Sequence, residues 1–172
     1  MDDSNIITQP ELLLPPEEGS REELWMREAI KLAIEAWYED EVPVGAIVVH
    51  NNEIIAKGKN TKEKNKDPLG HAEIQAIQAA AKALGSWRLE NTELYVTLEP
   101  CLMCSGAIIH ARIPKLIWGT HDPKTGACHS LYNTLNDNRL NHQVDLTHSV
   151  HKEACSQLLS AFFKAKRLSK QK

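Results

Sequence analysis

The sequence predicts an α/β protein, a three-layer α/β/α sandwich around a mixed central sheet of about five strands. Two observations lead to this prediction. Segments with helical periodicity alternate with short β-branched runs along the 172 residues, a length that suits one domain with its own core. The first two runs flank Asn51-Asn52, a pair that tolerates positive φ, so we expect them to form an antiparallel hairpin within the sheet.

The first predicted helix covers residues 20–41. Ser20 and Glu23 have the spacing of a capping box, in which each side chain bonds the backbone of the other residue. The apolar residues that follow the helical period are Trp25, Ala29, Ala33, Ala36 and Trp37.

The hairpin comes next, with strands over residues 44–50 and 53–58. A second helix is predicted over residues 71–84. Its buried stripe is expected to consist of Ile74, Ile77, Ala81 and Leu84.

The second half of the chain continues the alternation. Residues 93–98 are almost uniformly apolar, which is typical of a central strand covered on both faces. The elements expected after this strand are a helix over 101–113 that Pro114 stops, strands over 115–119 and 144–148, and a closing helix over 152–168.

The chain is expected to have three parts: a disordered acidic leader over residues 1–20, one domain over 21–168 and a basic tail over 169–172. The leader holds three prolines and no basic residue, and its leucine run is too short for a signal peptide. Nothing in the sequence indicates a membrane segment. Four cysteines at irregular positions favour a reducing compartment, the cytoplasm, where a close cysteine pair indicates a metal or catalysis.

The net charge of −3 does not indicate nucleic-acid binding, but the charge is unevenly distributed. Residues 57–66 hold five lysines and one glutamate, and residues 164–172 hold five basic residues and no acid. These segments are candidates for contacts with phosphates. Solvated lysines that keep the surface soluble are the alternative.

Cys101 and Cys104 lie in the first turn of a predicted helix that follows a strand, and their i, i+3 spacing puts them on one face. A helix N-terminus lowers the pKa of a thiol and favours the thiolates that bind metals. Three interpretations fit the pair by itself: a thioredoxin-like redox motif, part of a structural zinc site, or a catalytic zinc site with three protein ligands. No second pair of ligands follows at the spacing of a structural site.

His71 and Glu73 favour the catalytic zinc site. Residues two apart on a helix point about 200° away from each other, so the two side chains have different tasks. One histidine and two thiolates neutralise Zn²⁺, and a nearby carboxylate off the metal can take a proton from the bound water. The combination H-x-E followed by P-C-x-x-C is the signature of zinc-dependent nucleobase deaminases.

From about Trp25 to Arg167 the sequence resembles the bacterial tRNA-specific adenosine deaminases. The segments that carry the resemblance are "EVPVGAIVVHNNEII", "DPLGHAEIQAI", "LYVTLEPCLMCSGAIIHARI", "DPKTGA" and "LLSAFF". The resemblance implies a homodimer with one Zn²⁺ per chain that acts on a tRNA anticodon stem-loop. It also implies hydrolytic deamination of adenosine to inosine at the wobble position of an arginine tRNA, with zinc hydroxide attacking adenine C6 and Glu73 as the proton shuttle.

Transferred residue by residue, the resemblance assigns zinc binding to His71, Cys101 and Cys104 and proton transfer to Glu73. Six further positions are implied to bind substrate. They are Asn60 and the backbone of Ala72 at the flipped base, Asp122 and Lys124 beside the anticodon, and Phe162 and Phe163 on a helix that flanks the RNA.

The sequence departs from this family at two places. Cys128-His129 stands where the family commonly has Ala-Gly, and His121 stands where an arginine is frequent. We expect Cys128 to be inert packing and His129 to be solvated, with a further ligand as the alternative. We expect the histidine at position 121 to alter the contacts with the anticodon and to leave the deamination reaction unaffected.

Three other functions remain open on the sequence. They are a deaminase of free bases or nucleosides of the guanine or cytidine type, an RNA-binding subunit without activity, and a redox protein. The presence of Glu73 speaks against the RNA-binding subunit, because a structural zinc does not require that carboxylate.

Overall fold

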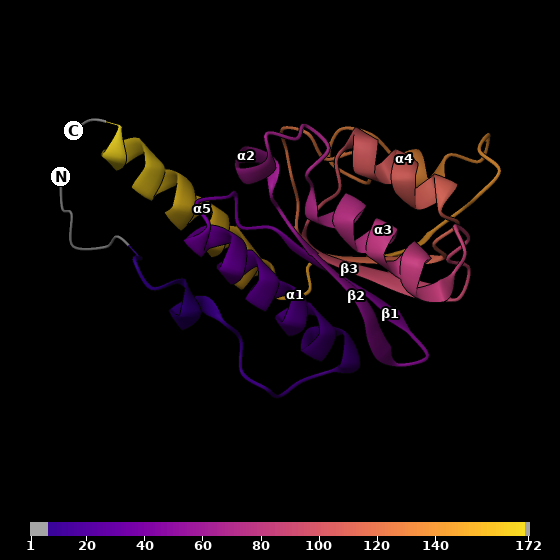
Figure 1. Ribbon diagram of the computed structural model, residues 1–172, viewed down its shortest axis with the longest axis horizontal. Helices are drawn as coiled ribbons and strands as arrows, with labels where there is room; N and C mark the ends of the chain where they lie inside the picture. Colours follow the sequence, from indigo (N-terminus) through magenta and orange to yellow (C-terminus); the bar gives the residue numbers. More distant parts are fainter. Residues whose placement is uncertain (1–6, 171–172) are drawn as a thin grey trace.

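A computed structural model describes residues 7–170 of the chain, and a five-stranded sheet forms its middle layer (Figure 1). The strands are β1 (Gly45–His50), β2 (Glu53–Lys59), β3 (Thr92–Leu98), β4 (Lys115–Thr120) and β5 (Asp145–Thr147). Their order is β2-β1-β3-β4-β5, with β1 antiparallel to β2 and β3, and with β3, β4 and β5 parallel. The predicted mixed sheet is confirmed.

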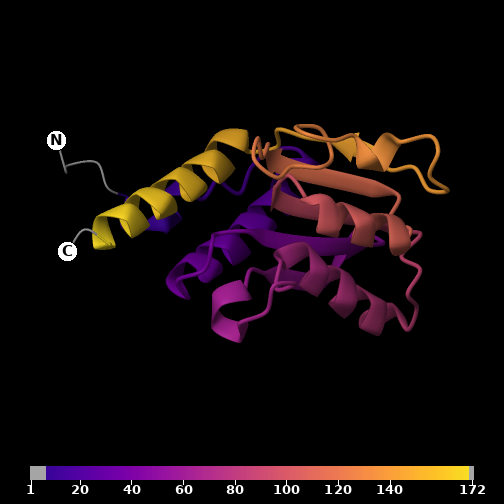
Figure 2. The same cartoon turned by 90° about the horizontal axis from the view of Figure 1, so that it is seen from above.

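Helices cover both faces of the sheet (Figures 1 and 2). The long helices are α1 (Arg21–Tyr38) and α5 (Lys152–Ser169) on one face, and α3 (Ala72–Leu84) and α4 (Leu102–His110) on the other. Alternate strand residues divide between the two faces, as the pleat of a strand requires. Val48 and Leu94 pack with α3 and α4, whereas Ile47 and Tyr95 pack with α1 and α5. The α/β/α sandwich is therefore confirmed.

Local signals in the sequence set the ends of several elements. Ser20 and Glu23 form the predicted capping box at the start of α1. Asn51 and Asn52 have φ angles of 50° and 60°, which close the β1–β2 hairpin as expected.

Two helices approach the sheet closely at glycines. A Cβ on Gly45 would lie 2.1 Å from the carbonyl oxygen of Ala29 in α1, and a Cβ on Gly58 would lie 2.1 Å from that of Ala72 in α3. Only small side chains fit at such contacts. The buried residues of α3 are accordingly Ala72, Glu73, Ala76 and Ala80.

The predicted stripe of α3 is therefore wrong. Ile77, Ala81 and Leu84 are only partly buried at the margin of the core, and Ile74 is also only partly buried. The prediction assumed that the larger apolar residues at helical spacing are the buried ones. The close contact with β2 at Gly58 instead requires alanine at the centre of the interface.

The leader also differs from the prediction of disorder over residues 1–20. Pro10–Leu13 form a short 3-10 helix, η2, in which Pro10 is buried. Arg27 of α1 donates a hydrogen bond to the carbonyl oxygen of Pro15 at 2.7 Å. The described part of the leader therefore packs on the domain. Residues 1–6, and residues 171–172 of the predicted tail, lie outside the described residues.

Within residues 7–170, no helix combines the length and the apolar character that a membrane crossing needs.

Candidate active site

Two helix N-termini meet at the carboxyl end of β3. His71 is the N-cap residue of α3 and Cys101 is the N-cap residue of α4, and neither side chain caps its own helix. Cys104 lies in the first turn of α4 and is buried. The three side chains are therefore available to one another. The sequence predicted both helix starts to within one residue.

The three side chains have the spacing of metal ligands. Nδ1 of His71 lies 3.7 Å from Sγ of Cys101 and 3.6 Å from Sγ of Cys104. A tetrahedral Zn²⁺ with ordinary bond lengths holds its nitrogen and sulfur ligands about 3.6 Å apart. His71, Cys101 and Cys104 therefore fit a zinc ion, and within residues 7–170 no other group of three or more histidines, cysteines and acids brings all its ligand atoms within 4.8 Å of one another.

The protonation of the two thiols also suits a cation. A hydrogen bond from the Cys104 thiol, together with the nearby His71, lowers the pKa of Cys101 to about 4. The same bond and burial raise the pKa of Cys104. One thiolate is thus present before a cation binds, and a bound cation favours loss of the second thiol proton.

Glu73 lies beside this group in a small pocket of 180 Å³, whose lining includes His71, Glu73, Cys101 and Asn60. The Glu73 side chain is deeply buried, and burial raises the pKa of its carboxyl to about 7. A carboxyl group with such a pKa can both accept and release a proton near neutral pH.

Asn60, at the end of β2, connects this pocket to α3. Its Oδ1 accepts a hydrogen bond from the backbone N–H of Ala72 at 3.3 Å. The Ala72 amide that we expected at the substrate is thus engaged with Asn60. Lys62 of the short helix α2 (Lys62–Asn65) lines the same pocket, although the sequence did not distinguish it from the other lysines.

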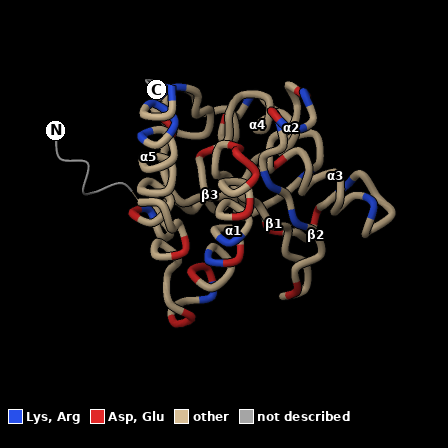
Figure 3. The backbone as a smooth tube through the Cα atoms, turned by 60° about the vertical axis from the view of Figure 1, so that its left-hand side comes forward, with Lys and Arg blue, Asp and Glu red and all other residues tan. Residues whose placement is uncertain are grey.

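The lysine-rich segment 57–66 is not a single basic loop. Its first residues belong to β2 and residues 62–65 form α2. Lys59 pairs with Glu35 and Glu39 of α1 at 3.0 and 2.8 Å, and Lys64 pairs with Glu39 at 3.2 Å. Part of the positive charge therefore serves to attach this segment to α1. Figure 3 shows the other basic segment, where Lys and Arg follow the C-terminal turns of α5.

Glu99 holds the loop that follows β4. Its carboxylate is buried and accepts hydrogen bonds from the backbone N–H groups of Asp122 at 3.0 Å, His129 at 2.7 Å and Ser130 at 2.8 Å. Burial by itself would raise the pKa of Glu99, but the Ser130 hydroxyl and these N–H groups lower it to about 2. Glu99 was not among the site residues that the sequence predicted. Its place directly before Pro100 and the cysteine pair is the signal that could have indicated it.

A groove of 540 Å³ continues from the pocket. The two share Val42, Leu98, Asp122 and Thr125 as lining residues. Further lining comes from both sides of the groove, namely His121, Pro123 and Lys124 from the loop after β4, and Leu159, Ser160, Phe163 and Arg167 from α5. Asp122 shapes this loop because its Oδ1 accepts a hydrogen bond from the backbone N–H of Lys124 at 2.9 Å.

The two phenylalanines of α5 have different surroundings. Phe163 is 44% exposed and lines the groove. Phe162 is buried, and its ring packs edge-on against Trp37 of α1 at a centroid distance of 5.4 Å. The structure thus brings Phe163 together with Asp122 and Lys124, and it places Phe162 between α5 and α1.

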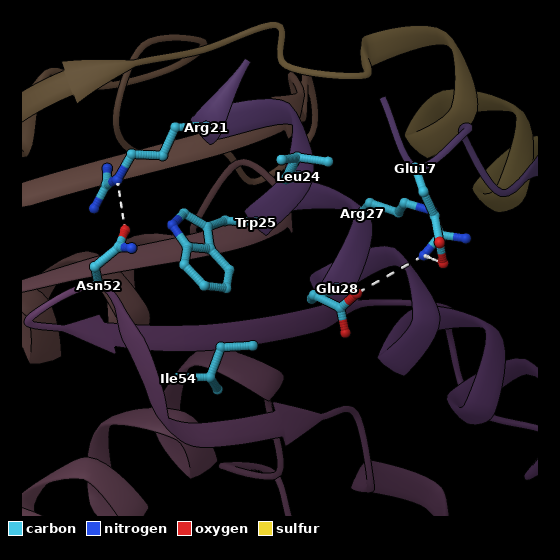
Figure 4. Close-up of a pocket in the computed structure, with 8 residues that line it drawn as sticks. All are labelled: Glu17, Arg21, Leu24, Trp25, Arg27, Glu28, Asn52 and Ile54. Atoms are coloured by element: carbon cyan, nitrogen blue, oxygen red, sulfur yellow. Dashed lines mark hydrogen bonds and ion pairs between the residues drawn. The ribbon is translucent and has the colours of Figure 1, made fainter. Parts of the chain in front are cut away.

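A separate cavity of 680 Å³ lies beside the first turns of α1 and the β1–β2 turn (Figure 4). Its charged groups are paired within the wall: Arg21 bonds Asn52, and Arg27 pairs with Glu17 and Glu28. Among the described residues it shares no lining residue with the pocket of Glu73.

Known proteins with similar sequences include several deaminases. The family model of MafB19-like deaminases matches residues 20–167. The tRNA-specific adenosine deaminase of Bacillus subtilis (strain 168) is 47% identical over 151 residues, which cover 88% of this chain and 94% of that protein. The tRNA-specific adenosine deaminase of Haemophilus influenzae is 45% identical over 150 residues, which cover 87% of each protein.

Solved structures show the same likeness. A structure from work on A-to-I editing by tRNA:A34 deaminases at the wobble position matches with a TM-score of 0.76 and 38% identity, over 78% of this chain and 98% of that chain. The guanine deaminase of Nitrosomonas europaea matches with a TM-score of 0.71 over 95% of this chain and 98% of that chain. At 22% identity, the second likeness concerns the fold alone.

Proposed function

The chain belongs to the family of tRNA-specific adenosine deaminases, and from this premise we propose that it converts the wobble adenosine of an arginine tRNA to inosine by zinc-dependent hydrolysis. The observation that carries the proposal is the continuity of the site. The pocket that holds Glu73 and the proposed zinc ligands His71 and Cys101 opens into a groove with aromatic and cationic walls.

Five residues in and beside the pocket have separate tasks in this reaction. His71, Cys101 and Cys104 would hold Zn²⁺, and the bound ion would lower the pKa of a water to about 7. Glu73 would take one proton from the attacking water and pass it to N1 of the adenine, and would then take the remaining hydroxyl proton and give it to the amino group, which leaves as ammonia. Its carboxyl pKa of about 7 suits transfer in both directions. Asn60, fixed through its bond with Ala72, helps hold the flipped base.

The groove suits a single-stranded RNA loop. An unpaired base leaves a loop at little cost, so adenosine can enter the small pocket while its neighbours remain in the groove. Lys124 and Arg167 provide positive charge for phosphates, and Phe163 provides a ring on which a base can stack. We therefore propose the anticodon stem-loop as the part of tRNA that binds.

We further propose a homodimer that forms through the outer face of α4. Leu102 on this helix is 55% exposed, and a Cβ built on Gly106 would meet open space. An apolar helix face next to open space offers a second copy room to pack closely. We also propose a cytoplasmic location, where tRNA is available and where the four cysteines, all unpaired in the structure, stay reduced.

The test is sequencing of tRNA and of an isolated anticodon hairpin after incubation with the purified protein. We expect adenosine-to-inosine conversion at the wobble base and one zinc per chain by metal analysis. In parallel, ammonia release is measured from free adenine, adenosine, guanine and cytidine. Rapid turnover of a free base or nucleoside, with no inosine in either RNA, would contradict the proposal and favour the alternative deaminase.

A further inference from the structure

Three histidines from separate segments gather where β4 and β5 end. The ring centroids of His121 and His129 lie 4.7 Å apart and the rings are stacked. The ring of His148 lies 4.9 Å from that of His121 and 5.5 Å from that of His129. Beneath them lies the buried Trp118, whose ring centroid is 5.2 Å from that of His148. We call His121, His129 and His148 the histidine cluster.

The cluster is held in place by the residues around it. Nε1 of Trp118 donates a hydrogen bond to Nδ1 of His121 at 3.3 Å, and the same Nδ1 lies 3.5 Å from Oε2 of Glu99. The backbone N–H of His129 donates to the Glu99 carboxylate at 2.7 Å. His129 and His148 nevertheless keep exposed side chains. The cluster is therefore a preformed aromatic surface that a ligand can reach.

The cluster adjoins the substrate groove. His121 lines this groove together with Phe163 and Arg167 of α5, so the loop after β4 and α5 each contribute an aromatic ring. His129 and His148 extend the wall beyond His121. Glu99 links the cluster to the pocket of Glu73, because Glu99 also lines that pocket.

The observations favour a base over a metal ion as the ligand. Among residues 7–170, His71, Cys101 and Cys104 are the only group of three or more histidines, cysteines and acids whose ligand atoms all lie within 4.8 Å of one another, and the histidine cluster is not such a group. The contacts within the cluster are between ring faces, which leaves aromatic surface for stacking. Burial, followed by repulsion from His121 and His129, lowers the pKa of His148, which favours an uncharged ring there.

We propose that the histidine cluster binds one unpaired base of the RNA that flanks the edited adenosine, by stacking of that base on the imidazole rings. The inference rests on the proposed function, since it assigns a subsite within the same RNA groove. Arrays of aromatic rings next to cations are the usual surface for unpaired nucleotides, and Arg167 and Lys124 supply the cations here.

The test uses the full-length protein and an anticodon hairpin RNA. The double variant His129→Ala/His148→Ala is compared with His129→Phe/His148→Phe, which keeps aromatic rings, and with the control His50→Ala at the opposite end of the sheet. The loop nucleotides other than the edited adenosine are replaced by abasic nucleotides one at a time. KM, kcat, zinc content and melting temperature are measured for each protein.

The alanine variant loses the rings on which one base would stack. Its KM should therefore be about tenfold higher, with kcat and zinc content unchanged. The phenylalanine variant and the His50 control should keep the original KM. One abasic position should raise KM about tenfold for the unaltered protein and produce no further rise for the alanine variant.

Three results would overturn the inference. They are an unchanged KM in the alanine variant, an equal penalty in both proteins at every abasic position, and a second zinc equivalent that the alanine variant loses. A different result would contradict the proposed function itself. In that case the unaltered protein would form no inosine in the intact hairpin.

Discussion

At the scale of single residues, two buried carboxyl groups of one site have opposite pKa shifts. Burial raises the pKa of Glu73 to about 7. Glu99 is equally buried, but hydrogen bonds from Ser130, Asp122 and His129 lower its pKa to about 2. Glu73 can therefore exchange protons near neutral pH, whereas Glu99 stays charged and holds a loop.

The first prediction separates proton transfer from metal binding. Glu73→Gln should reduce turnover at least about 100-fold, since the general acid and base is lost, while the zinc content stays at one per chain. His71→Ala should lose both zinc and activity, because one of three ligands is gone. Metal analysis and inosine formation are measured on the same preparations. A fully active Glu73→Gln protein would contradict the assignment.

The ion pair of Arg21 and Glu93 leads to a prediction on pH. Arg21 contacts both carboxylate oxygens of Glu93 at 2.9 and 3.0 Å, and the Tyr95 hydroxyl donates to the same carboxylate at 2.7 Å. Burial opposes the charge, but these bonds lower the pKa of Glu93 from its ordinary 4.5. A lowered pKa stabilises the folded state above pH 4.5, and this stabilisation is lost as the pH falls below that value.

Glu93→Gln should therefore reduce the free energy of unfolding by about 1 kcal/mol at neutral pH. The difference from the unaltered protein should stay constant above the ordinary carboxyl pKa of 4.5 and shrink as the pH falls below that value. Urea unfolding at several pH values measures it, with the exposed Glu90→Gln as the control. A difference that stays constant with pH would count against this ion pair.

At the scale of elements, small residues determine how closely the helices lie on the sheet. Gly45 faces α1 and Gly58 faces α3, each at a distance where a Cβ would overlap helix backbone. Because α3 begins with His71 at its N-cap, its position on β2 also sets the position of a zinc ligand. The packing of this helix is thus coupled to the site.

These two glycines form a matched pair of variants. Gly58→Ala and Gly45→Ala should each lower the free energy of unfolding by about 2 kcal/mol, because the added methyl group displaces a helix. Only Gly58→Ala should release zinc more readily to a chelator, since α1 carries no ligand. Equal zinc retention in both variants would show that the position of α3 does not control the site.

At the scale of the whole molecule, the sheet order brings distant segments to one edge. β3 and β4 are parallel neighbours, so Glu99 after β3 and His121 after β4 leave the sheet side by side. β5 adds His148 at the same edge. The carboxyl ends of parallel strands therefore form both the pocket and the groove.

The proposed dimer leads to a prediction at this scale. Leu102→Glu places a charge on the exposed face of α4, and burial of that charge between two copies would be unfavourable. Sedimentation analysis should show a dimer for the unaltered protein and a monomer for this variant. Leu12→Glu on η2, where the leucine is 78% exposed, is the control and should remain dimeric. A monomeric unaltered protein at micromolar concentration would contradict the proposal.

Sequence patterns were sufficient to predict the fold class, the hairpin and both helix starts that carry the candidate zinc ligands, because caps, turns and periodicity are local. They also indicated His71, Glu73, Cys101 and Cys104 as candidate site residues, since their spacing forms a recognisable motif. Three features depended on packing between segments far apart in the chain: the alanine interface of α3, the hydrogen bonds of Glu99 and the histidine cluster. Only the tertiary structure could decide these, because contacts across a sheet follow strand order and register, which local residue patterns do not encode.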